Sequence, residues 1–159
     1  MIIEQTTFLP CSPQQCFEEV KTSHLMLHVA SPMVKFIPIQ PSSLPERWEQ
    51  KVYVVSLRLF GFLPIGKQWI NISGRKRSKE MGRFYVEFRD NGRGTLISTW
   101  DHLITIQAPK QGNGTIYTDR VEIKAGILTP FVCLFAWLFY RHRQKRWQRL
   151  VANRFSYND

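Results

Sequence analysis

Alternation of apolar and polar positions predicts strands along most of the chain. Segments near 2–8, 33–39, 47–60, 67–74, 83–90, 95–107 and 115–124 are rich in β-branched and aromatic residues. The residues between them favour turns: a basic stretch at 75–79, the dipeptide Asn91-Gly92 and the segment 111–114. Seven strands joined in this way predict an antiparallel meander.

Two short helices are predicted directly after the first strand. Ser12 is a good N-cap and Pro13 suits the first helical position, so a helix should run from there to about Lys21. Thr22 and Ser23 can cap a second helix that ends near Val29, because a proline follows at position 32.

A long final helix is predicted from Thr129 and Pro130 to about Asn153, roughly 36 Å at 1.5 Å per residue. Taking Trp147 as the inward anchor, the 100° periodicity places on the same side Cys133, Ala136, Tyr140, Leu150 and Val151. The opposite side carries Phe131, Leu134 and Leu138, and then basic residues. The first half of the helix is therefore apolar all round, which predicts that it contacts something on both sides.

These elements predict an α+β fold of the helix-grip type. A curved antiparallel sheet of about seven strands, with two short helices after its first strand, would wrap around the long C-terminal helix. The length of 159 residues and an apolar content of 43% fit one domain, 1–159, with its own core.

The formal net charge of +10 favours anionic partners. The basic residues of the final helix circle it instead of forming one stripe, and no nucleic-acid-binding motif accompanies them: Arg141, Arg143, Lys145, Arg146 and Arg149. Specific binding of nucleic acid is therefore not expected. An anionic head group or membrane surface suits a basic, aromatic-rich helix better.

Three cysteines without a CxxC pair argue against a disulfide framework and favour a reducing cytoplasm. The N-terminus lacks the basic and apolar regions of a signal peptide. The longest apolar run, 131–140, is too short to cross a bilayer. We therefore expect a cytoplasmic protein.

The strongest candidate for chemistry is a pair formed by His102 and Asp119 on consecutive strands. If Ile106 pairs with Thr115, then His102 lies directly opposite Asp119 on a mostly apolar face. A carboxylate beside an imidazole orients the ring and raises its basicity, as in a general acid/base. The alternative is a structural polar pair that satisfies itself inside the sheet.

The direction in which His102 points depends on the preceding turn. A two-residue turn at Asn91-Gly92 would instead place Asp101 on the face of Phe88. An odd-length loop or a bulge at Gly94 would restore the inward direction of His102.

No cofactor or metal is expected. Of the four histidines, only His24 and His28 have i, i+4 spacing, and no cysteine or carboxylate joins them at usable spacing. There is no GxSxG motif for nucleophilic catalysis. Gly92 and Gly94 are followed by a strand and not by a helix, so they do not form a dinucleotide fingerprint.

The chain resembles the START/SRPBCC superfamily, which includes the major birch pollen allergen, polyketide cyclases and lipid-transfer domains. The order of elements matches throughout, and the motifs lie between positions 100 and 141. They are Trp100-Asp101-His102, Gly114-Thr115, Asp119-Arg120-Val121, Gly126 and Phe139-Tyr140-Arg141. A second histidine common in relatives is replaced here by Ile104. The resemblance implies a cavity between sheet and helix, and no fixed ligand.

The leading hypothesis is a module that binds a hydrophobic small molecule or lipid in this cavity. Expected wall residues are Tyr53, Val55, Leu57, Phe84, Val86, Phe88, Trp100, Tyr117 and Phe135, with His102 and Asp119 as polar contacts. One alternative is a cyclase or dehydratase that uses His102 with Asp119. Another is an interaction protein that meets a membrane or a second protomer through Phe131, Leu134 and Leu138.

Overall fold

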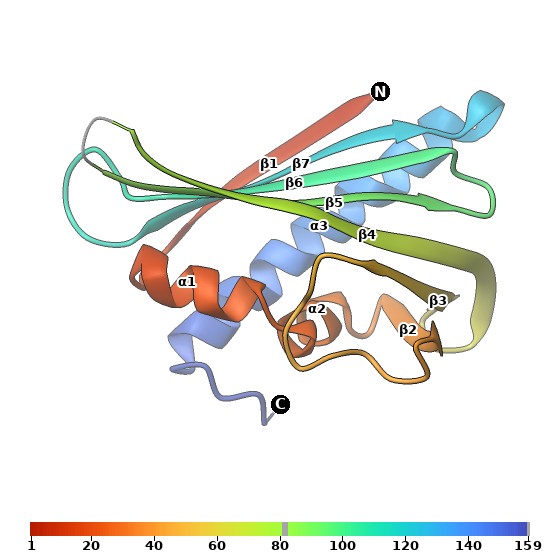
Figure 1. The fold of residues 1–159 in the computed structure, drawn as a ribbon, viewed down its shortest axis with the longest axis horizontal. Coiled ribbons are helices and arrows are strands. Elements are labelled where there is room, and N and C mark those ends of the chain that lie inside the picture. The colour runs from red at the N-terminus through yellow and green to blue at the C-terminus, as the bar shows by residue number, and fades with distance from the viewer. Residues whose placement is uncertain (81–82, 159) are drawn as a thin grey trace.

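Seven strands form one curved antiparallel sheet (Figure 1). The computed structural model describes residues 1–80 and 83–158, with side chains except at 75–80. The strands are β1 (Ile2–Leu9), β2 (Val34–Gln40), β3 (Val52–Leu59), β4 (Leu63–Glu80), β5 (Arg83–Gly94), β6 (Thr99–Gln107) and β7 (Thr115–Lys124). Their order in the sheet is β1-β7-β6-β5-β4-β3-β2, so each hairpin from β2 to β7 pairs neighbours in the chain.

Helices α1 (Pro13–Val20) and α2 (Ser23–Ala30) follow β1, as the capping residues predicted. The Ser12 hydroxyl accepts a hydrogen bond from the backbone N–H of Gln15, and Thr22 does the same for Leu25. Each bond satisfies one of the free N–H groups at the start of a helix. Both helices lie on the same side of the sheet as the final helix (Figure 1).

The final helix, α3 (Thr129–Ala152), follows a single 3₁₀ turn, η1 (Gly126–Leu128), and crosses beneath the sheet (Figure 1). Its predicted inward face is confirmed, because all the residues assigned to the side of Trp147 are buried: Cys133, Ala136, Tyr140, Leu150 and Val151. The opposite residues Phe131, Leu134 and Leu138 are exposed. The helix-grip prediction is thereby confirmed.

The predicted hairpin turn at Asn91-Gly92 is wrong. Both residues lie within β5, and the chain turns at 95–98. Gly92 is needed for close approach, since a Cβ there would lie 2.3 Å from the backbone oxygen of Trp69 in β4. In the observed register Asp90 lies opposite His102, so His102 keeps its inward direction.

The predicted register of β6 and β7 is also wrong, by two residues. His102 pairs with Val121, and Asp119 pairs with Ile104. The connection between β6 and β7 allows a shift of two residues. Because side chains alternate between the two faces with a period of two, every side chain stays on its predicted face.

Other strand boundaries also differ from the prediction: β4 begins at Leu63 instead of 67, and β6 begins at Thr99 instead of 95. The basic stretch 75–79 continues β4 instead of forming a turn, and the third strand begins at Val52 instead of 47.

Candidate functional site

The larger of two adjoining cavities, the outer chamber, has a volume of about 350 Å³ and lies between the first half of α3 and strands β2 to β6. Its polar side chains are Lys67, Gln68 and Thr95. The rest of its wall is apolar apart from Gly94, and comprises Val34, Phe36, Leu57, Leu59, Ile65, Leu96, Ile97, Trp100, Leu128, Phe131, Val132, Phe135 and Phe139. A cavity of this size and lining suits a hydrophobic small molecule.

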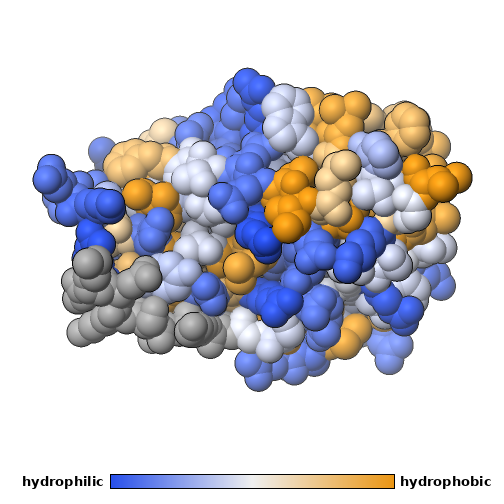
Figure 2. Space-filling model, turned by 90° about the horizontal axis from the view of Figure 1, so that it is seen from above, coloured by the Kyte–Doolittle hydropathy of each residue, from blue (hydrophilic) through white to orange (hydrophobic). Residues whose placement is uncertain are grey.

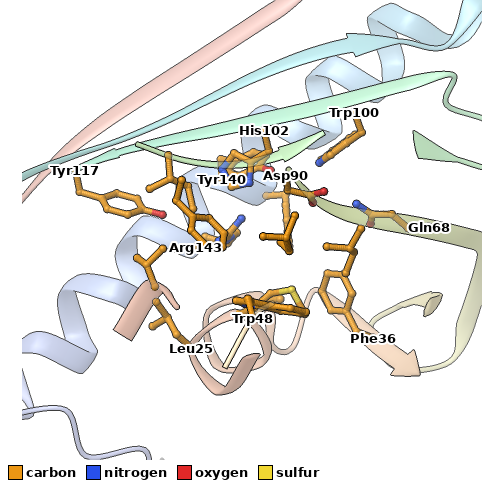
Figure 3. A pocket seen from close by; sticks show the side chains of 18 residues that line it. Leu25, Phe36, Trp48, Gln68, Asp90, Trp100, His102, Tyr117, Tyr140 and Arg143 are labelled. Atoms are coloured by element: carbon orange, nitrogen blue, oxygen red, sulfur yellow. The ribbon is translucent and has the colours of Figure 1, made fainter. Parts of the chain in front are cut away.

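The smaller cavity, the inner chamber, has a volume of about 80 Å³ and lies deeper under the sheet. Phe36, Gln68, Trp100 and Phe139 line both chambers, so the two cavities share part of their wall. The inner wall is more polar, since it includes Asp90, His102, Tyr117, Tyr140 and Arg143 (Figure 3). Below these side chains, Trp48 forms the floor (Figure 3).

His102 and Asp119 meet at the inner end, although they are not directly opposite. The Nε2 atom of His102 lies 2.8 Å from Oδ1 of Asp119, a diagonal contact across β6 and β7. Asp119 also accepts hydrogen bonds from the Tyr117 hydroxyl and from Nε2 of Gln144. The Gln144 amide donates in addition to the backbone oxygen of Gln5, and so ties α3 to β1.

The charge states of this pair follow from its surroundings. Burial alone would raise the pKa of Asp119, but the hydrogen bonds from His102 and Gln144 and the charge of Arg143 lower it on balance. Burial lowers the pKa of His102 more than Asp119 raises it. An ionised Asp119 accepts only, so Nε2 of the neutral His102 carries the proton and its Nδ1 remains an acceptor.

Arg143 projects from α3 into the centre of the inner chamber (Figure 3). Its guanidinium carbon lies 5.0 Å from the ring centre of Tyr140 and 5.7 Å from that of Phe139. No carboxylate oxygen of the described residues lies within 4 Å of it. Burial works to lower the pKa of Arg143, but the nearby Asp119 raises it, so the cation persists.

Asp90 faces the same chamber from β5 (Figure 3). Its Oδ1 accepts a hydrogen bond from the backbone N–H of Asn71 at 2.7 Å. Burial raises the pKa of Asp90 to about 7, and the negative charge of Asp101 adds to this, while the Asn71 N–H and Arg143 oppose it. Asp90 is therefore the carboxyl group of the chamber that gains or loses a proton near neutral pH.

The structure spreads the predicted wall residues over several places. Phe88, Trp100, His102 and Tyr117 line the inner chamber, whereas Leu57, Trp100 and Phe135 line the outer one. Tyr53, Val55 and Val86 are buried in the core and line neither chamber. Phe84 borders a separate surface hollow near Gln107, and Asp119 lies behind the inner chamber next to Gln144 and Trp147.

Several polar side chains of the two chambers were not predicted from the sequence: Lys67, Gln68, Thr95, Asp90 and Arg143. Arg143 is one of the basic residues that circle the final helix, and it lies three residues after Tyr140 and four before Trp147, both inward on α3. Asp90 shares the phase of Val86 and Phe88 in β5. Helical and strand periodicity could therefore have identified both.

Within residues 1–80 and 83–158, no three side chains of His, Cys, Asp or Glu gather closely enough to hold a metal ion. Over the same residues, none of the helices is both long and apolar enough to span a bilayer.

Comparisons with known proteins identify the fold. A START superfamily protein from Mycobacterium smegmatis superposes with a TM-score of 0.60 at 13% identity, over 96% of this chain and 97% of the other. A protein from Chromobacterium violaceum superposes with a TM-score of 0.58 at 15% identity, over 94% of this chain and 96% of the other. Truncated norcoclaurine synthase from Thalictrum flavum superposes with a TM-score of 0.57 at 10% identity, over 95% of this chain and 92% of the other. These likenesses confirm the START/SRPBCC fold.

A family model matches most of the sequence. No curated protein sequence matches the chain. The model described as "Domain of unknown function (DUF8410)" matches residues 7–151, and the chain therefore belongs to that family.

Proposed function

We propose that the protein binds a hydrophobic small molecule or lipid in the outer chamber. The observation that carries this proposal is the chamber itself, a cavity of about 350 Å³ with an almost wholly apolar wall between sheet and α3. Each methylene group that moves from water into such a wall contributes about 0.8 kcal/mol, so an alkyl chain of moderate length suffices for binding. The fold shared with a START superfamily protein also supports the proposal.

Two measurements test this function. Native mass spectrometry of the purified protein should reveal co-purified small molecules. Titration with the neutral fluorescent dye N-phenyl-1-naphthylamine, followed by displacement with 1-decanol, should show a saturable apolar site. The purified protein should bind the dye and release it to 1-decanol.

Matched tryptophan variants locate the site on α3. Val132 lines the outer chamber, so Val132→Trp should fill the space and weaken 1-decanol binding about tenfold or more. Leu138 lies on the exposed side of the same helix and does not line the chamber, so Leu138→Trp should leave binding unchanged. Absence of dye binding, or equal binding by the wild type and Val132→Trp, would contradict the proposal.

Access to the chamber is proposed to involve an anionic membrane surface. Three exposed apolar side chains, Leu96, Leu128 and Phe131, line the outer chamber. Further exposed apolar side chains lie near them in the sequence or on the segment between β3 and β4, whose residue Ile65 also lines the chamber: Phe60, Phe62, Leu63, Ile127 and Leu134. Figure 2 shows apolar side chains gathered toward the end of the molecule at which α3 begins. We call these eight residues the apolar rim.

Charge favours a membrane over a second protomer as the partner of the apolar rim. The segments 57–67, 91–100 and 123–138 carry four charged residues, and all are basic: Arg58, Lys67, Arg93 and Lys124, the last of which forms an ion pair with Glu122. An apolar patch flanked by cations suits insertion among anionic lipids, whereas two copies would bring like charges together.

Flotation with vesicles distinguishes membrane binding from self-association. Binding to vesicles of phosphatidylcholine with phosphatidylserine should exceed binding to phosphatidylcholine alone and should weaken with salt. Phe131→Lys should abolish it. A dimer in sedimentation that Leu134→Lys dissolves would instead assign the face to self-association, and a monomer that ignores both vesicles would overturn the proposal.

A second candidate function rests on the His102–Asp119 pair. A neutral imidazole held by an ionised carboxylate, with Nδ1 free to accept a proton and the side chain on the wall of the inner chamber, has the arrangement of a general base. An enzyme of the cyclase or dehydratase kind would use this base. Turnover of a polyketide-like substrate that His102→Gln abolishes would support it, and binding without turnover would exclude it for that substrate.

A further inference from the structure

The inner chamber holds a positive charge without a directly paired carboxylate. The guanidinium of Arg143 contacts the faces of Tyr140 and Phe139, and no carboxylate oxygen of the described residues is within ion-pair distance. A charge withdrawn from water is costly unless an opposite charge and hydrogen bonds compensate for it. An anionic group placed in this chamber would supply both.

The nearby carboxylate of Asp119 compensates the charge of Arg143 only in part. Asp119 already accepts hydrogen bonds from His102, Tyr117 and Gln144, so its oxygens are largely occupied. Arginine has five N–H donors in a planar fork that matches a carboxylate in bidentate fashion. Among the described residues, Arg143 has a hydrogen bond with the Tyr140 side chain, which leaves further N–H donors of the fork for a ligand.

The size of the chamber selects among anions. Its volume of about 80 Å³ is several times the roughly 10–15 Å³ that one water needs on the same measure, and it is small beside the outer chamber, which has about 350 Å³. This space suits a carboxylate of a few heavy atoms better than a phosphodiester with its substituents. The side chains of Phe36, Trp100 and Phe139 border both chambers, so an alkyl chain attached to that carboxylate would reach the outer chamber by passing between these side chains.

We propose that the ligand is a hydrophobic carboxylic acid, whose carboxylate binds Arg143 in the inner chamber while its hydrocarbon chain fills the outer chamber. This inference rests on the proposed function, because it requires the outer chamber to hold an apolar chain.

Acidic and basic groups face Arg143 from three elements. Asp90 approaches from β5, His102 from β6 and Asp119 from β7, and Tyr140 lies one turn away on α3. Asp119 stays ionised and His102 stays neutral near pH 7, since both have lowered pKa values. Asp90 is the group that changes: protonated, it can donate to the ligand carboxylate, and ionised, it repels it. Affinity for the acid should therefore fall between pH 6 and pH 8.

Competition between two ligands with the same chain tests the inference without any variant. Sodium decanoate and 1-decanol are each used to displace N-phenyl-1-naphthylamine from the purified protein at pH 6. A purely apolar cavity would prefer the alcohol, because the carboxylate loses more hydration on entry. With Arg143 as the anchor, decanoate should bind about tenfold more tightly than 1-decanol.

Variants then assign the preference to one side chain. Arg143→Gln should weaken decanoate binding about tenfold or more and leave 1-decanol within about twofold. Arg149 lies exposed on the same helix, so Arg149→Gln is the matched control and should keep the wild-type preference. If Arg143→Gln does not fold, Arg143→Lys, which keeps the charge but loses the planar fork, should still show a reduced preference.

The outcomes separate the two proposals. Binding of 1-decanol with no preference for decanoate, or a preference that survives in Arg143→Gln, would overturn the carboxylate site alone. Failure of both ligands and of the dye to bind would overturn the proposed function together with it.

Discussion

Trp147 offers the sharpest test of the core beneath the sheet. Its side chain is 2% exposed and packs edge-on against Tyr117 and Phe155, with ring centres 6.3 Å and 6.0 Å away. Truncation of a buried tryptophan to alanine costs about 3–5 kcal/mol. Its Nε1–H has no acceptor among the described residues, and truncation removes this unpaired donor, whose burial costs about 1–3 kcal/mol. We therefore expect Trp147→Ala to lose about 3 kcal/mol, the lower end of the range.

Urea unfolding of wild type and variant measures this loss. The midpoint should fall with an unchanged slope, and the melting temperature should drop by roughly 6–12 °C. Trp137 is 40% exposed on the same helix, so Trp137→Ala is the control and should lose less than about 1 kcal/mol. Trp147→Phe keeps a ring and removes the unpaired donor, and should lose less than Trp147→Ala. A loss below about 0.5 kcal/mol for Trp147→Ala would refute its place in the core.

Two further predictions concern strand geometry and pH. Gly92→Ala should lose about 2 kcal/mol or more, because the new Cβ would meet the backbone oxygen of Trp69, while Gly74→Ala, with nothing within 4 Å, should be neutral in the same melts. Equal losses would contradict the close approach. The pKa of Asp90 is raised to about 7, so the folded protein keeps a proton that the unfolded chain releases near pH 4, and stability contributed by Asp90 falls as the pH rises from about 4 to 7. Asp90→Asn should flatten that slope in urea melts across this range, and an unchanged slope would argue against the raised pKa.

The helices were predictable because their signals are local. Ser12 and Thr22 mark their helix starts through side-chain caps that need only the next three residues. The 3.6-residue period of α3 likewise lies within one segment, so its buried and exposed faces could be assigned before any tertiary contact was known.

The errors arose where a distant segment decides the outcome. Asn91-Gly92 is a strong turn signal in isolation, but in the fold Gly92 serves the approach of β4 and the strand continues. The register of β6 against β7 depends on how the connecting loop closes, and the side-chain pattern is the same after a shift of two. The pattern therefore placed His102 and Asp119 on the correct face while leaving their pairing undetermined.

Cavity walls were harder to predict than the core. Apolar side chains of similar phase fall into both classes: Val86 fills the core, while Phe88, two residues later in β5, lines the inner chamber. Which of them faces empty space depends on side chains from other elements, such as Phe36 and Trp48, that do not share a strand with them. No single-strand pattern contains this information.

A comparison of Asp119 with Arg143 indicates which of these two buried charges has hydrogen-bonding capacity left for a ligand. Both groups lie under the sheet and keep their charges, but Asp119 has three hydrogen-bond donors and is almost completely enclosed, so its role is satisfied by the protein itself. Arg143 contacts the rings of Phe139 and Tyr140, has one hydrogen bond with the Tyr140 side chain, and lines a cavity. A satisfied buried charge stabilises one arrangement of the strands and helix, whereas a charge with spare donors gains from an added anion. Chemistry at this site is therefore expected to start from recognition of a negative group by Arg143, with His102 as the nearest neutral base if a reaction follows.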